Sequence, residues 1–214
     1  MLIINADDFG RNRIATDKIV ACYNSNKITS TSAMVFMEDS KRAADLAKEN
    51  CIDVGLHLNL SEKFTDQTQS TIFNDYHERI IKFLTKKKYN LLFYNVVLRK
   101  EFDYIFKKQI EEFVHIYEKE PSHIDGHHHM HLCTNILIDN IIPKHQKVRR
   151  NFSFSPGEKS LLNRTYRFII DNWLSRKYII TDYFFSLLEC MNTKKLFYVF
   201  ELSKSFNVEL QTHP

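Results

Sequence analysis

The chain has 214 residues, of which 43% are hydrophobic and 26% are charged, and its formal net charge is +4. This composition lies near the globular average, which excludes a disordered chain, collagen and a low-complexity scaffold. The basic excess is scattered along the sequence, so nucleic acid is not an expected partner. We expect residues 1–214 to form a single domain.

The N-terminus and the cysteines indicate a cytoplasmic protein. No apolar run approaches the roughly 18 residues that cross a bilayer, and Asp7 and Asp8 stand where the apolar part of a signal peptide would continue. The four cysteines are isolated, and a chain of this length does not need disulfides to fold. We therefore expect no membrane partner and reduced thiols.

Strand and helix patterns alternate along the sequence. In chain order they predict strands at 2–6, 32–36, 53–60, 123–125, 147–149, 177–184 and 207–212, and helices at 14–22, 39–49, 74–87, 96–118, 133–142, 159–175 and 192–204. This alternation is typical of a parallel α/β sheet or barrel and not of a β-sandwich. The predicted fold class is therefore α/β.

The first motif that carries chemistry is Asn-Ala-Asp-Asp-Phe-Gly at 5–10, where Asp7 and Asp8 stand side by side after the first predicted strand. Two carboxylates so close resist ionising together unless a cation or a proton intervenes. Aspartate is also a favoured N-cap, and a helix is predicted to follow. From this segment alone, a capping pair and a cation site both stay open.

Two histidine motifs follow the third and fourth predicted strands. Gly-Leu-His-Leu-Asn at 55–59 places His57 on the polar face of its strand, where a lone histidine is often structural. The motif at 123–131 holds five of the ten histidines. A surface accident is the alternative there, but the tract is enclosed by a strand and an apolar helix. His127 can reach a metal from extended or helical backbone, and His128 or His129 would then line the pocket or orient the ligands.

Two further motifs also follow predicted strands: Lys-Val-Arg, which ends at Arg149, and the closing Glu-Leu-Gln-Thr-His-Pro, which contains His213. Parallel α/β barrels assemble their active sites at the C-terminal ends of the strands. Side chains more than a hundred positions apart in the sequence would therefore converge there.

Together with Thr-Ser-Thr-Ser-Ala-Met-Val at 29–35, these motifs resemble the YdjC-like carbohydrate deacetylases, which include chitooligosaccharide deacetylases and are distantly related to NodB-type polysaccharide deacetylases. The matching motifs follow one another in the family's order from the first residues to the last. The segments 61–120 and 150–206 carry none of these motifs. It implies a distorted (β/α) barrel of about seven strands. It also implies a metal-dependent hydrolase that removes the N-acetyl group from acetylated amino sugars or short chitooligosaccharides.

The resemblance further implies that Asp8, His57 and His127 hold one divalent ion, magnesium or zinc. Two imidazoles and one carboxylate leave coordination sites open for a water and for the acetyl oxygen, as amide hydrolysis requires.

The remaining roles come from the same resemblance. Asp7 would be the catalytic base, and His213 of the His-Pro motif would be the acid that protonates the departing amine. Arg149 and His129 would contact the sugar substrate.

Other interpretations stay open. Two histidines and one carboxylate also describe a non-haem iron oxygenase, although those sites usually lie on β-rich scaffolds. Members of the resembled family continue past the His-Pro motif, whereas this sequence ends at Pro214. The barrel would then be left open at one edge, and the chain would be a catalytically weak or degenerate relative that binds metal or sugar. A second copy that covers the open edge would make a homodimer and hold His213 in place.

Overall fold

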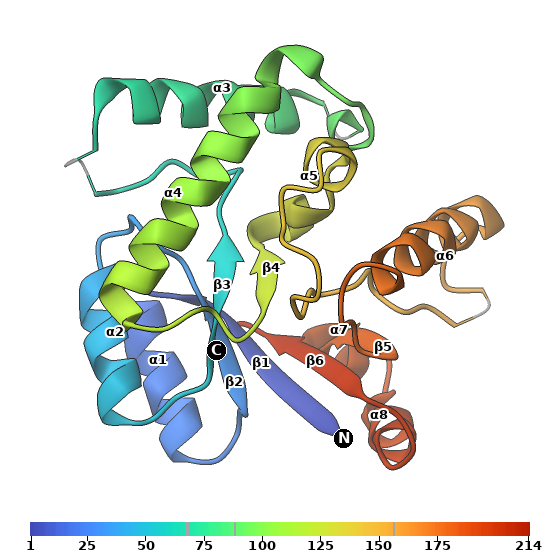
Figure 1. Ribbon diagram of the computed structural model, residues 1–214. Helices are drawn as coiled ribbons and strands as arrows, with labels where there is room; N and C mark the ends of the chain where they lie inside the picture. The colour runs from blue at the N-terminus through green and yellow to red at the C-terminus, as the bar shows by residue number, and fades with distance from the viewer. Residues whose placement is uncertain (67–68, 88, 156) are drawn as a thin grey trace.

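The computed structural model describes residues 1–66, 69–87, 89–155 and 157–214. Within them, parallel strands form one sheet, curved into a half-barrel, in the order β4-β3-β2-β1-β6-β5. The strands are β1 (Leu2–Phe9), β2 (Ser30–Ala33), β3 (Val54–Leu58), β4 (Ile124–Gly126), β5 (Tyr183–Ser186) and β6 (Val208–Thr212). β1 and β6, from opposite ends of the chain, lie side by side (Figure 1).

Isolated bridges carry the backbone pairing beyond β4. Val148 pairs with Ile124, and Lys147 pairs with Ile179. The predicted strand at 147–149 is present as this bridged segment. The expected distorted (β/α) barrel is confirmed, with six strands in the sheet instead of about seven.

The helices lie outside the sheet. They are α1 (Arg13–Asn24), α2 (Ser40–Glu49), α3 (Thr71–Lys86), α4 (Arg99–Tyr117), α5 (Thr134–Ile138), α6 (Leu161–Ser175), α7 (Leu187–Asn192) and α8 (Leu196–Ser203), with 3-10 turns at Asn90–Leu92, Val96–Leu98 and His127–Leu132. Figure 1 shows α1 and α2 together on one side of the sheet and α6 on the opposite side. Among the described residues, none of the helices has both the length and the apolar character needed to span a membrane.

The first predicted strand and the helix predicted at 192–204 differ from the structure. β1 continues to Phe9, whose carbonyl accepts a hydrogen bond from Met34, so Asp7 and Asp8 lie within the strand and not after it. The predicted helix at 192–204 is present as α8 but begins later, because the chain turns through Lys194 at φ 56°, and α7 before it was not predicted.

The predicted strand at 177–184 begins later than expected. Arg150 donates to the carbonyls of Thr181 and Asp182, so these two acceptors are taken by a guanidinium just before the strand. Regular pairing starts only at Tyr183.

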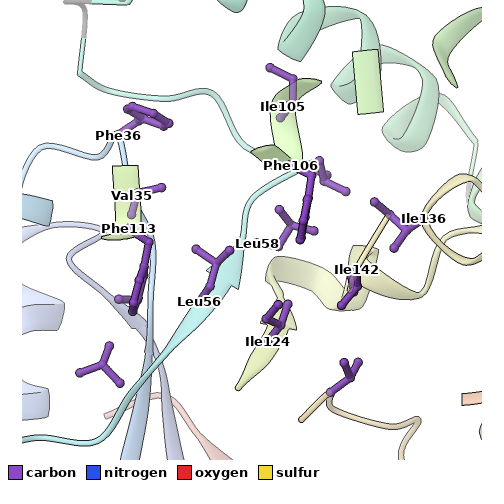
Figure 2. Close-up of a cluster of buried hydrophobic side chains, with 14 of the residues drawn as sticks. Val35, Phe36, Leu56, Leu58, Ile105, Phe106, Phe113, Ile124, Ile136 and Ile142 are labelled. Atoms are coloured by element: carbon purple, nitrogen blue, oxygen red, sulfur yellow. The ribbon is translucent and has the colours of Figure 1, made fainter. Parts of the chain in front are cut away.

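The apolar core lies between the outer face of the sheet and α4. Figure 2 shows Leu56 and Leu58 of β3 beside Phe113 and Phe106 of α4, and all four side chains are buried. Because side chains alternate along a strand, His57 between the two leucines points the other way, into the half-barrel. Packing on α4 therefore fixes the direction of a predicted metal ligand.

Replacing Phe113 with Ala should lower the free energy of unfolding by about 3–5 kcal/mol, because a fully buried ring is lost and a cavity remains. Urea denaturation followed by circular dichroism measures this change. Phe93→Ala is the matched control, since Phe93 is 63% exposed, and its effect should stay within about 0.5 kcal/mol. Equal losses in the two variants would contradict the position of the core.

Candidate active site

Asp7 and Asp8 both reach the inside of the half-barrel, although neighbours in a regular strand point to opposite faces. The pairing register of β1 with β2 shifts between Ala6 and Phe9, and Asp8 has a φ of 69°. Aspartate tolerates this left-handed conformation better than most residues do, and such local strain is common at functional sites. The irregularity therefore places two adjacent carboxylates in one site.

Asp8 lies against two histidines from neighbouring strands. Its Oδ1 is 3.0 Å from Nδ1 of His127 and 3.3 Å from Nε2 of His57. All three residues are buried, and one ligand atom from each lies within 4.8 Å of the others. The structure thus brings together the three residues predicted to hold a metal.

Carboxylates also lie at the other ring nitrogens of both histidines. Asp125 on β4 pairs with His57 in register, and its Oδ1 is 2.7 Å from Nδ1 of His57. Nε2 of His127 lies 3.1 Å from Oε2 of Glu62. A carboxylate that hydrogen-bonds the outer nitrogen of a ligand histidine fixes the orientation of the ring. Asp125 makes this bond to His57, whereas among the described residues Nε2 of His127 has no hydrogen-bond partner.

The histidine tract is anchored in the interior by His127 and His131, which are both buried, whereas His128 is exposed. After His127 the chain turns through His128 and His129, which both have positive φ, and His131 is buried with Nε2 2.9 Å from the carbonyl oxygen of Arg149. A Cβ on Gly126 would lie 2.9 Å from the backbone nitrogen of His131, so this close approach requires glycine. The interpretation as a surface accident is therefore wrong.

Arg149 lies fully inside the half-barrel, with a side chain that is 1% exposed. Its two terminal nitrogens donate to both oxygens of Asp7 at 2.7 and 2.8 Å. The same guanidinium is 2.6 Å from Asp125 and donates to Glu209 at 2.6 Å. One cation thus connects three buried carboxylates.

Asp7 accepts three further side-chain hydrogen bonds, from Gln211 at 2.6 Å, from Asn5 at 2.9 Å and from Ser32 at 3.3 Å. Burial alone would raise the pKa of Asp7, but the charge of Arg149 holds this pKa below its ordinary value.

The α1 helix is capped by Asn12, which accepts from the amide of Ala15. The capping role considered for the aspartates is therefore wrong.

The charges around Asp8 also favour a cation. Burial acts to raise the pKa of Asp8, but the hydrogen bonds from His127 and His57 hold it well below its ordinary range. Burial acts to lower the pKa of His57, yet the nearby Asp125 and Asp7 carboxylates raise this pKa to about 10. The carboxylates are thus ionised and attract positive charge, and a divalent ion bound here would displace the proton of His57.

The distances test whether a metal fits. Zinc bonds to nitrogen and oxygen of about 2.0–2.1 Å place neighbouring ligand atoms roughly 3 Å apart. The spacings of 3.0 and 3.3 Å around Asp8 Oδ1 agree with this geometry. Asp7, His57 and Asp125 form a second close group of possible ligands. Both carboxylates of this second group, however, already pair with Arg149.

A cavity of about 250 Å³ opens beside the aspartates. Its walls are formed by Asp7, Asp8, Arg11, Asn12, Ile14, Ala15, Lys18, Ile19, His213 and Pro214. His213 is exposed at this cavity, so the predicted base, one predicted ligand and the predicted acid all border the same space.

The two residues predicted to contact substrate lie elsewhere. Arg149 points to the buried carboxylates, and the ring of His129 packs against Phe152 and Phe184 with centroid distances of 4.7 and 5.8 Å. Burial and the charge of Arg149 lower the pKa of His129 to about 3, so this imidazole is neutral. Contact of either residue with a substrate stays a prediction.

Sequence reasoning gave no role to several residues that hold the site together: Asn5, Glu62, Asp125, Glu209 and Gln211. A signal existed for some of them. Glu209 and Gln211 alternate with His213 in the closing motif, and Asp125 lies inside the histidine motif. The two-residue period of a strand places such positions on one face.

The chain is similar to several known proteins. The chain is 37% identical over 127 residues to carbohydrate deacetylase 2 of Listeria innocua, an alignment that covers 59% of this chain and 49% of that protein. It is 34% identical over 138 residues to the chitooligosaccharide deacetylase of Proteus mirabilis, covering 64% of this chain and 52% of that protein. The alignments thus span about half the length of these relatives.

Two broader matches follow. A carbohydrate deacetylase of Clostridium beijerinckii is 28% identical over 195 residues, with coverage of 88% of this chain and 75% of that protein. The crystal structure of an Enterococcus faecalis V583 protein matches the fold with a TM-score of 0.69 at 19% identity. The match covers all of this chain and 80% of that protein's chain, which supports the fold.

A sequence model described as YdjC-like protein matches residues 1–214, and the chain therefore belongs to the YdjC-like family.

Proposed function

We propose that the chain is a metal-dependent hydrolase that removes the N-acetyl group from acetylated amino sugars or short chitooligosaccharides. The observation that carries this proposal is the contact of Asp8 with His57 and His127, next to a second ionised carboxylate, Asp7, at a common cavity. The names of the relatives, carbohydrate and chitooligosaccharide deacetylases, support the same reaction.

Asp8, His57 and His127 would hold the ion. When bound, a divalent ion supplies an activated water and polarises the acetyl carbonyl. Of magnesium and zinc, the donor set favours zinc, because imidazole nitrogen suits zinc whereas magnesium prefers oxygen ligands.

Asp7 would accept the proton of the attacking water. The Arg149 fork keeps Asp7 ionised and fixes the plane of its carboxylate, so the group is ready to take a proton. Collapse of the tetrahedral intermediate requires a proton on the departing sugar amine, and His213, exposed at the same cavity, would donate it.

A homodimer and a cytoplasmic location stay predictions from the sequence.

Acetate release from acetylated chitooligosaccharides tests the function directly. The chain loaded with zinc should release acetate, and removal of the ion by a chelator should stop the reaction until zinc is restored. A chain that binds zinc with full occupancy but releases no acetate from any acetylated amino sugar would contradict the proposed reaction. It would support instead the interpretation as a degenerate relative that binds metal or sugar.

His57→Ala and His127→Ala should each abolish stoichiometric zinc binding, because each removes one of three ligands. Elemental analysis after gel filtration measures the bound zinc per chain. His115→Ala is the matched control, since the side chain of His115 is 75% exposed and should leave the occupancy unchanged. Zinc retained at one equivalent in a His57→Ala and His127→Ala double variant would refute the ligand assignment.

Asp7 and Asp8 should separate in function. Asp7→Asn should retain zinc and lower kcat by about 10²–10⁴-fold, because a positioned base is lost. Asp8→Asn should lose zinc as well as activity. Equal loss of zinc in the two variants would contradict this division of roles.

A further inference from the structure

The closing motif contributes more than His213. Glu209 and Gln211 lie two positions apart on β6, so their side chains share one face of the strand. In register, Glu209 pairs with Ile3 and Gln211 pairs with Asn5 of β1. This face of β6 therefore points toward Asp7, which follows Asn5 by two residues.

Gln211 contacts the carboxylate of Asp7 directly. Its Nε2 donates to Oδ2 at 2.6 Å, while Asn5 donates to the other oxygen, Oδ1, at 2.9 Å. Gln211 is 8% exposed, so water does not easily replace its amide. The two amides hold opposite oxygens and oppose rotation of the carboxylate.

Glu209 acts one step further away, through Arg149. Its Oε1 accepts from Nε at 2.6 Å, while the two terminal nitrogens of Arg149 donate to Asp7. A guanidinium is planar, so a bond at Nε fixes the plane of the whole group, including the two donors that face Asp7. Glu209 therefore sets the angle at which Arg149 meets the carboxylate.

The burial of Glu209 is costly. Burial raises its pKa to about 7 despite the opposing charge of Arg149. A carboxylate whose pKa is higher in the folded protein than in the unfolded chain lowers the stability of the fold as the pH rises from about 4.5 to about 7. Stability alone therefore does not account for a carboxylate at this position, whereas orientation of Arg149 does.

We propose that Glu209 and Gln211 are positioning residues that orient the Asp7 carboxylate, Gln211 by direct contact and Glu209 through Arg149. This inference rests on the proposed role of Asp7 as the base. A base must keep its geometry to within a fraction of an ångström, and a misplacement of about 1 Å can cost roughly 10²-fold in rate.

The experiment compares Gln211→Met and Glu209→Leu, which remove the contacts, with Glu209→Gln, which keeps an acceptor for Nε of Arg149. Gln211→Met and Glu209→Leu should lower kcat by about 10–100-fold, with KM and the zinc occupancy unchanged. Glu209→Gln should retain kcat within about threefold, because its amide oxygen still orients the guanidinium.

Asn135→Leu is the matched control for a merely structural effect. Asn135 is 1% exposed and hydrogen-bonds the backbone of Asn95, so its replacement should lower the melting temperature but not kcat. Unchanged kcat in Gln211→Met and Glu209→Leu would overturn the positioning role. Loss of kcat in Glu209→Gln equal to that in Glu209→Leu would overturn the indirect role of Glu209.

Crystal structures of the zinc-loaded variants separate this inference from the proposed reaction. In Gln211→Met and Glu209→Leu, Asp7 should rotate or occupy more than one conformation, whereas it should stay fixed in Glu209→Gln. An unmoved Asp7 in all three variants would overturn the inference. Absence of acetate release by the unsubstituted chain would count against the proposed reaction alone, because the orientation of Asp7 is measured without turnover.

Discussion

The ion pairs of Arg149 with Asp7, Asp125 and Glu209 are the interaction on which the interior of the half-barrel depends. Each of these side chains is less than a tenth exposed, and a charge in such surroundings is tolerated only when it is paired. The three carboxylates come from β1, β4 and β6. One guanidinium therefore joins strands that lie at the edge and in the middle of the sheet. Its loss would remove the arginine cation from three buried carboxylates, of which Asp125 keeps the imidazole of His57 as a partner.

The same arrangement explains how two adjacent aspartates have different tasks. Arg149 binds both oxygens of Asp7, whereas Asp8 pairs with Arg11 through Oδ2 only and turns Oδ1 toward two imidazoles that could hold an exchangeable cation. The left-handed backbone at Asp8 makes this division possible, because a regular strand would turn one carboxylate to the outer face. Arg149 beside Asp7 and a metal beside Asp8 would keep both carboxylates ionised at a short separation.

Much of the fold and the grouping of Asp8, His57 and His127 could be predicted from the sequence, because strand ends and candidate metal ligands have local signatures. His57 lies between two core leucines, and this alternation gives its direction. The inward turn of Asp8 could not be predicted, since it depends on a register shift with β2. The partners of Arg149 could not be predicted either, because no local pattern around 147–149 shows whether an arginine faces substrate or buried carboxylates. The late start of β5 follows from the contacts of Arg150 with backbone carbonyls, which periodicity does not record.

The order of the residues along the chain separates two tasks of the site. The predicted metal ligands lie between positions 8 and 127, on or directly after β1, β3 and β4, whereas Arg149, Glu209 and Gln211, which hold the predicted base, follow them in the sequence. The contact of Gln211 with Asp7 spans 204 positions and exists only because β6 pairs with β1. Asn5 also holds Asp7, so both ends of the chain orient the predicted base, whereas β6 contributes none of the predicted metal ligands. Changes in β6 could therefore alter the orientation of Asp7 without removing a predicted ligand.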